Sequence, residues 1–150
     1  MNLTSLLSCF LFLLFAGTAQ GQECLIGTTE VSFGSYDFIS KAPLDATGRV
    51  TVVCDGAFTF SVKLDQGQNS TGSFNPRVLR AAAAEEGLNY NLFVDSTRQN
   101  IWGDGTSNTF VNTGTANNIQ IPLTVYGRIP AQQKVPMGSY FDQINVIVEW

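Results

Sequence analysis

Catalytic chemistry needs a nucleophile, a base or a set of metal ligands, and this sequence offers few residues for any of them. It contains no histidine, so the usual general base and the commonest metal ligand are absent. Serine and threonine are plentiful, but their hydroxyls become nucleophiles only beside an activating base. Neither Lys41 nor Lys134 lies in a motif that would supply such a base. We therefore expect no catalytic residues, no cofactor and no enzymatic activity.

Two acidic stretches could in principle handle protons or cations. Glu85 and Glu86 are adjacent in the sequence, and adjacent residues on a helix point apart, so a solvated turn is favoured over a paired acid and base. The segment 102–106 (WGDGT) could form an oxygen-rich turn around Asp104. Calcium loops, however, need several spaced acidic or carbonyl ligands, and the D-x-D-x-D-G spacing is missing. We predict a packed Trp102 beside a tight turn, and no metal site.

Aromatic residues and net charge bear on which ligands the chain could bind. Tyr36, Phe38, Phe74 and Tyr140 lie in segments that read as exposed, and such rings can stack on sugars. More often, aromatic residues in these places close the ends of a β-sandwich, so a carbohydrate-binding role is the weaker interpretation. The formal charge of −4 gives no basic surface for nucleic acid, which we exclude as a partner.

The N-terminal stretch predicts an exported protein. An apolar run begins near Leu6 and is followed by small residues up to Gly21. This pattern is typical of a secretory signal whose apolar part is too short to span a bilayer. We expect residues 1–21 to be a signal peptide, with cleavage after Ala19 or Gly21, and residues 22–150 to form one domain. No second apolar run is long enough for a membrane span.

Cysteine usage agrees with export. Cys9 lies inside the predicted signal, so the mature chain keeps Cys24 and Cys54. Two cysteines in an exported chain are expected to form one disulfide, and the alternative is a pair of buried thiols. In the chain-entropy model, closing a loop of about 30 residues stabilises the fold by roughly 3–4 kcal/mol.

The mature chain reads as a series of short strands separated by turn residues. Apolar and β-branched residues alternate in several runs, which is typical of half-buried strands. The run 49–54, the turn Asp55-Gly56 and the run 58–64 together predict a β-hairpin. A third run, 119–126, is either a pair of strands or one strand bent at Pro122. The remaining predicted strands are 29–33, 88–95 and 144–150.

The segments between these runs are mostly predicted loops. Residues 40–48 and 65–77 carry the Pro, Asp and Gly residues that favour loops. Residues 78–86 are either two helical turns, favoured by four alanines, or a strand of small residues. With about six or seven strands and almost no helix, the sequence predicts an all-β sandwich of two packed sheets.

The closing strand has an unusual position. Ile144, Val146, Val148 and Trp150 alternate with residues that are polar except for Ile147, so the first set shares one sheet face. The strand stops on the last residue of the sequence. We therefore expect a strand edge that no following strand covers, which is a pairing hazard unless a partner covers it.

Six motifs occur in this order over the whole predicted mature chain: FGSYD (33–37), GRVTVVC (48–54), LNYNLFVD (88–95), WGDGT (102–106), VYGRIPAQQ (125–133) and GSYFDQINVIVEW (138–150). Together they resemble the spore coat protein U family, in which they occur in the same order. That family includes subunits of archaic chaperone–usher pili of the Csu type and secreted proteins of spore or cell coats. The combination is specific, whereas any one motif alone is weak.

The resemblance implies an immunoglobulin-like sandwich that lacks its last strand and so has an apolar groove. A periplasmic chaperone would fill this groove first. At the outer-membrane usher, the N-terminal strand of a neighbouring pilus subunit would replace it, which is donor-strand complementation. The protein would pass through the periplasm to the cell surface.

The resemblance also implies roles for particular residues. Cys24 and Cys54 would be the family's disulfide between the first strand and the next. The terminal carboxylate would be the place where the chaperone anchors the chain. The residues that would border or line the groove are Ile144, Val146, Val148 and Trp150.

One departure from the family's pattern concerns the residues before Cys24. Polymerising subunits carry an alternating donor strand of about a dozen residues there, whereas little more than Gln22 and Glu23 follows the predicted cleavage site. We therefore expect a subunit that accepts a strand without donating one, at the end of a fibre. The alternatives are a coat protein that folds alone, a small carbohydrate-binding adhesin module, or a longer chain whose true start lies elsewhere.

Overall fold

The computed structural model describes residues 23–81 and 86–150. The predicted signal peptide, residues 1–21, and Glu85 lie outside these ranges. The described residues form eight β-strands and no helix, so none of them belongs to a helix that could cross a membrane. The strands are β1 (Cys24–Thr29), β2 (Leu44–Cys54), β3 (Ala57–Leu64), β4 (Arg77–Leu79), β5 (Leu88–Phe93), β6 (Asn112–Asn117), β7 (Ile121–Ile129) and β8 (Val146–Glu149).

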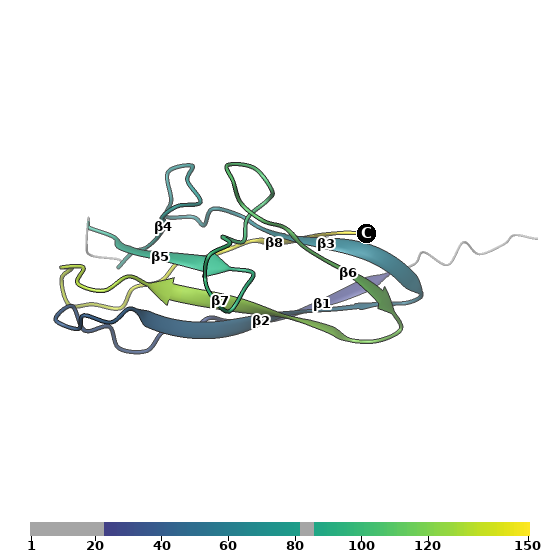
Figure 1. Ribbon diagram of the computed structural model, residues 1–150, viewed down its shortest axis with the longest axis horizontal. Helices are drawn as coiled ribbons and strands as arrows, with labels where there is room; N and C mark the ends of the chain where they lie inside the picture. Colours follow the sequence, from purple (N-terminus) through teal and green to yellow (C-terminus); the bar gives the residue numbers. More distant parts are fainter. Residues whose placement is uncertain (1–22, 82–85) are drawn as a thin grey trace, which may run out of the picture.

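The strands form two antiparallel sheets of unequal width. The wider sheet has the order β1-β2-β7-β5-β4 and the narrower one the order β6-β3-β8. Figure 1 shows β3 and β8 in one layer and β1 and β2 in the other. The sheets pack face to face as an immunoglobulin-like β-sandwich, which confirms the predicted fold class.

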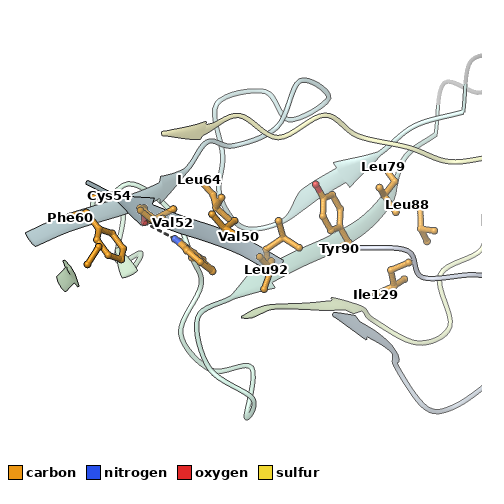
Figure 2. Packing of buried hydrophobic residues seen from close by; sticks show 14 residues of the cluster. Val50, Val52, Cys54, Phe60, Leu64, Leu79, Leu88, Tyr90, Leu92 and Ile129 are labelled. Carbon is orange, nitrogen blue, oxygen red and sulfur yellow. Dashed lines mark hydrogen bonds between the residues drawn. The ribbon is translucent and has the colours of Figure 1, made fainter. Parts of the chain in front are cut away.

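The core lies between the inner faces of the two sheets. Period-two alternation explains it, because every second side chain of β2, β3, β5 and β7 points inward. Figure 2 shows side chains from both sheets meeting in this layer. The buried residues include Val50, Val52 and Cys54 from β2, Phe60, Val62 and Leu64 from β3, Leu88, Tyr90 and Leu92 from β5, and Val125 and Ile129 from β7.

Trp102 anchors the loop that contains the WGDGT motif. Its ring is fully buried, and its indole Nε1 donates a hydrogen bond to the backbone oxygen of Val62 at 2.8 Å. Asp104 accepts a hydrogen bond from the backbone N–H of Thr106 at 2.8 Å. The prediction of a packed tryptophan beside a tight turn is confirmed. Within the described residues, no group of three or more acidic or cysteine side chains is placed to hold a metal ion.

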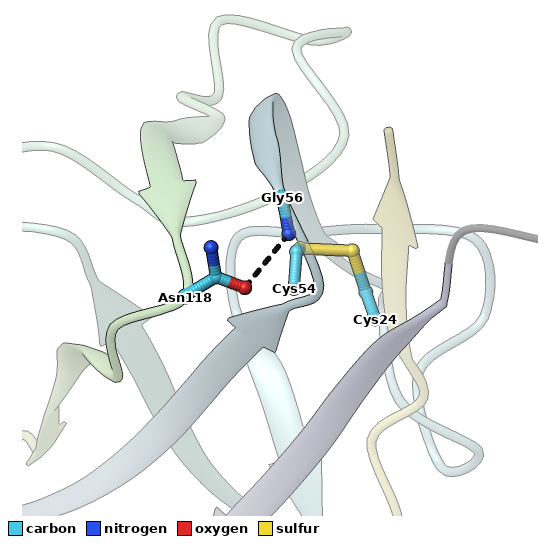
Figure 3. Close-up of a disulfide and its surroundings, with 4 residues drawn as sticks. All are labelled: Cys24, Cys54, Gly56 and Asn118. Carbon is cyan, nitrogen blue, oxygen red and sulfur yellow. Dashed lines mark hydrogen bonds between the residues drawn. A yellow bond between two sulfur atoms is a disulfide. The ribbon is translucent and has the colours of Figure 1, made fainter.

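A disulfide joins Cys24 to Cys54, as predicted. The two residues are directly paired across β1 and β2, and Figure 3 shows the bond tying the start of β1 to the end of β2. Beside it, the side-chain oxygen of Asn118 accepts a hydrogen bond from the backbone N–H of Gly56 at 3.0 Å. Both edge strand and turn are therefore fixed at this end of the sandwich.

The hairpin predicted from residues 49–54 and 58–64 is wrong. β2 pairs with β1 and β7, whereas β3 pairs with β6 and β8. The turn at Asp55-Gly56 carries the chain from one sheet to the other. Alternation shows that two strands bury one face each, but paired strands and facing strands give the same pattern.

Strand boundaries also differ from the sequence prediction. β2 begins at Leu44, inside the predicted loop 40–48, because β7 is long enough to pair with it from Leu44 to Val52. β7 runs unbroken through Pro122. Proline is tolerated there because β5 pairs only with residues 126–128 of β7, so Pro122 has a strand neighbour on one side alone.

The structure also decides between the two alternatives for residues 78–86 and corrects the predicted strand 29–33. In residues 78–86, the described part contains no helix and begins as strand: β4 ends at Leu79, and Arg80 makes an isolated bridge with Phe141. The predicted strand 29–33 is wrong, because the first strand, β1, ends at Thr29. The chain beyond it packs on the inner face of the sheet through Val31 and Phe33, without a ladder partner among the described residues.

We predict that replacing both cysteines, Cys24→Ser with Cys54→Ser, lowers the free energy of unfolding by about 3–4 kcal/mol, because the unfolded chain regains the entropy of a loop of about 30 residues. Urea unfolding followed by the fluorescence of buried Trp102 measures this. A reducing agent should produce a similar loss in the wild type and none in the double variant. A loss below about 1 kcal/mol in the double variant would contradict the expected contribution.

Candidate functional site

An open groove of about 930 Å³ lies between the two sheets. It reaches β1 at Thr28 and β2 at Val50, while the disulfide at Cys24 and Cys54 lies beyond it. Residues of the hydrophobic core form its floor, on the side where the narrow sheet does not cover the wide sheet. The floor residues are Leu64, Leu79, Leu88, Tyr90, Leu92, Val125 and Ile129.

The first wall of the groove is the segment 28–36, which comprises the last two residues of β1 and the chain that follows them. Val31 and Phe33 pack onto the inner face of the wide sheet over Gly48 and Gly127. A Cβ at Gly127 would lie 2.7 Å from both Phe33 and Val31, so these glycines make the room that the two side chains occupy. Phe33 also meets the ring of Tyr90 edge-on at 6.2 Å between centroids. The alternation in residues 29–33 therefore reflects packing on a sheet rather than membership of one.

The second wall is formed by residues 135–146, and its last residues lead into β8. Of the four residues predicted to border the groove, Ile144 and Val146 are among its lining. Val148 packs against the core from the same face of β8 and pairs with Val62 of β3, beyond the lining. Trp150 follows the end of β8 with 54% of its surface exposed and does not line the groove.

Each wall is continuous with an edge strand, β1 for the first wall and β8 for the second, and the outer edge of each strand is unpaired within the described part of the chain. Among the described residues, β1 is the last strand of the wide sheet and β8 the last strand of the narrow one. Ile26 pairs with Val52 and shares its inward face. Yet 44% of Ile26 is exposed while Val52 is fully buried. The inner face of the wide sheet therefore lacks a covering layer at β1.

One polar pair lies at the groove. The hydroxyl of Tyr90 donates a hydrogen bond to the carboxylate of Asp142 at 2.8 Å. Burial, followed by this hydrogen bond, raises the pKa of Tyr90, so the phenol stays protonated and remains a donor. Asp142 also accepts hydrogen bonds from the backbone N–H groups of Asn69 and Gln143. Both groups are therefore already partnered within the protein.

The aromatic residues considered for sugar binding are largely engaged in internal contacts. The hydroxyl of Tyr36 donates to the backbone oxygen of Pro130, and the hydroxyl of Tyr140 donates to that of Pro136. Phe74 is buried under the guanidinium of Arg77. Phe38 is half exposed at the groove. Tyr36, Phe38 and Tyr140 are among the residues that line the groove, whereas Phe74 is not.

The geometry suits burial of apolar side chains and pairing of an added backbone. The floor is apolar, and the edges of β1 and β8 expose backbone N–H and C=O groups that a strand can use. Alternation in residues 144–148 indicated one wall from sequence. The other wall was missed, although Val31 and Phe33 carried the signal, because their partners Gly48 and Gly127 are distant in sequence.

Comparison with known proteins gives three findings. The chain matches the family model described as Spore Coat Protein U domain over residues 11–147. It is 34% identical over 139 residues to Protein U of Myxococcus xanthus, covering 83% of this chain and 75% of that protein.

The third finding is a structural likeness. A chain of the crystal structure of the CsuC-CsuE chaperone-tip adhesion subunit pre-assembly complex, from archaic chaperone-usher Csu pili of Acinetobacter baumannii, superposes with a TM-score of 0.60. Sequence identity is 21%, and the match covers 86% of this chain and 40% of that chain. At this identity the likeness shows the sandwich fold, and the chain spans well under half of the length of its structural neighbour.

We predict that Gly127→Ala destabilises the fold by about 1–3 kcal/mol, because the new methyl group displaces Val31 and Phe33 from the wall of the groove. Gly27→Ala is the matched control on the same sheet. Its Cβ would lie 3.9 Å from the Cβ of Thr51, an ordinary contact, so no loss is expected. Urea unfolding compares the two. Equal effects would show that the segment 28–36 does not occupy this face.

Proposed function

The chain belongs to the spore coat protein U domain family, and from this premise we propose that it is a non-enzymatic structural subunit of a surface pilus or coat. In this role its groove accepts an extended strand from a partner protein. The observation that carries the proposal is the open groove, with the core as its floor and the unpaired edges of β1 and β8 beside it.

An extended strand fits the groove for two physical reasons. Its backbone completes the hydrogen bonding of an exposed strand edge, which is the usual mode of β-augmentation. Its alternate side chains reach the apolar floor, and burying each Val- or Leu-sized side chain contributes about 1.5–3 kcal/mol. Ile144 and Val146 on one side and Val31 and Phe33 on the other bound the space that those side chains enter.

The proposed partners follow from the strand-accepting role. They are a periplasmic chaperone, an outer-membrane usher and neighbouring pilus subunits. In support, the structural neighbour belongs to a chaperone–subunit complex that precedes assembly. The chaperone supplies the first strand, and a neighbouring subunit replaces it during assembly at the cell surface.

A second candidate function is a coat protein that folds alone, favoured by the family's description and by the similarity to Protein U. Here the segment 28–36 is itself sufficient cover for the wide sheet. Val31 and Phe33, which already pack on Gly48 and Gly127, are the observation in its favour. The two functions differ in one property: whether the isolated domain gains stability from an added strand.

We predict that residues 22–150 gain stability when a strand of about eight residues, alternating Val and Thr, is fused after Trp150 through a flexible linker. Thermal unfolding should shift upward by about 10 °C, because several apolar side chains become buried. A strand of the same composition with its valines in one block is the control for added hydrophobicity. Equal stability of the free and fused proteins would contradict strand acceptance and favour a self-sufficient coat protein.

Neighbouring residues on β8 provide a matched test of where the fused strand lies. Val146 lines the groove, whereas Ile147 points to the opposite face and pairs with Lys63. Val146→Asp should abolish the gain from the fused strand, and Ile147→Asp should leave it. A similar effect of both substitutions would place the strand outside the groove.

We also propose that the protein is exported, with residues 1–21 as its signal peptide. The intact mass of the protein recovered from the periplasm or cell surface measures this, and we expect the mature chain to begin at Gln20 or Gln22. Such a start leaves no donor strand before Cys24, which supports the terminal position expected from the sequence. A mature chain that retains the residues before Ala19 would contradict both.

A further inference from the structure

Among the described residues, Arg77 is the only charged residue that is buried, and none of its surface is exposed. Its guanidinium bonds to neutral oxygens. Nε and Nη2 donate to the backbone oxygen of Asp65 at 3.1 and 2.7 Å, Nη2 also donates to that of Trp102 at 2.7 Å, and Nη1 donates to the side-chain oxygen of Asn91 at 2.8 Å. Burial of a charge is costly, so this arrangement needs a reason beyond filling space.

Asp65 is the residue that Arg77 holds most firmly, since two of the four hydrogen bonds go to its carbonyl oxygen. The same residue contacts Asn145 three times. The backbone N–H of Asp65 donates to the backbone oxygen of Asn145 at 3.1 Å. Its carboxylate accepts from the backbone N–H and the side-chain Nδ2 of Asn145, at 3.0 and 2.6 Å. Asp65 therefore clamps Asn145 through both its backbone and its side chain.

Asn145 lies between Ile144 and Val146, the two residues of the closing segment that line the groove. Asn145 also lies just before the ladder between β8 and β3, whose first pair is Val146 with Leu64. Upstream of that pair, the wall is held by contacts with the loop after β3. Besides the Asp65 clamp, the backbone N–H of Gln68 donates to the backbone oxygen of Gln143 at 3.1 Å.

We propose that Asp65, oriented by buried Arg77, is a positioning residue of the strand-accepting groove: it fixes Asn145 and thereby sets Ile144 and Val146 for the incoming strand. This inference rests on the strand-accepting function proposed above and names the residues that prepare the groove for it. Holding a binding edge in its bound conformation raises affinity by lowering the ordering cost of binding.

The location of the clamp separates this role from a purely structural one. The hydrogen bonds from Asn145 to the Asp65 carboxylate are on the exposed side of the molecule, where such bonds contribute little to folding. Their loss therefore loosens the groove wall more than it destabilises the sandwich.

The experiment uses residues 22–150 with the fused alternating strand and a protease site in the linker. After cleavage, dissociation of the strand is followed by exchange against a labelled copy of the same strand. We expect Asp65→Asn to speed dissociation about tenfold, while the unfolding temperature of the uncleaved protein changes little. Asp104→Asn is the control: it weakens a carboxylate contact with Thr106 in an exposed turn outside the groove, and dissociation should be unchanged.

A reciprocal exchange tests the pair itself. Combining Asp65→Asn with Asn145→Asp again pairs an amide with a carboxylate, so the charge-assisted hydrogen bond that two amides cannot make is restored, and slow dissociation should return. An unchanged dissociation rate in Asp65→Asn would overturn the inference, while strand binding to the wild type would still support the proposed function. An equal fall in stability with and without the strand would likewise assign Asp65 a structural role alone. Failure of the strand to bind the wild type would overturn both proposals.

Discussion

The structure depends on a mismatch in width between two packed sheets. A sandwich buries its inner faces only where one sheet lies over the other, and here three strands face five. Val52 is covered and fully buried, while its neighbour Ile26 on β1 is exposed over nearly half of its surface although it shares the same face. The groove is the consequence, because the uncovered part of the wide sheet is apolar core.

Segments outside the strands cover part of this exposed inner face. On one side, Val31 and Phe33 pack on glycines of the wide sheet. On the other, the chain before β8 is held by carboxylates and carbonyl groups, through Asp65 and Asp142, rather than by a continuous ladder. Buried Arg77 belongs to the same scheme, since it satisfies carbonyl oxygens of the loop after β3 and of the Trp102 turn. Polar contacts therefore shape an apolar groove.

Much of this could be predicted from the sequence, and the failures have a common cause. Alternation identified the buried faces of β2, β3 and β5 and the inward residues Ile144 and Val146, because it reports which face a side chain occupies. It does not report which strand lies alongside, so β2 and β3 were predicted to pair although they face each other. The clamp between Asp65 and Asn145 joins residues 80 positions apart, and single side chains at that separation leave no periodic signal.

The placement of the disulfide bears on how the groove could be filled. Cys24 and Cys54 lock the start of β1 to the end of β2 outside the groove, whereas β1 reaches the groove at Thr28, near its other end. The covalent bond thus fixes the register of the edge strand where the groove is absent, and it does so without occupying the uncovered face. In the proposed function, an incoming strand would pair and bury its side chains in the groove while β1 stays in register. The same bond limits fraying of β1, which, with its unpaired outer edge, would otherwise be prone to non-specific association.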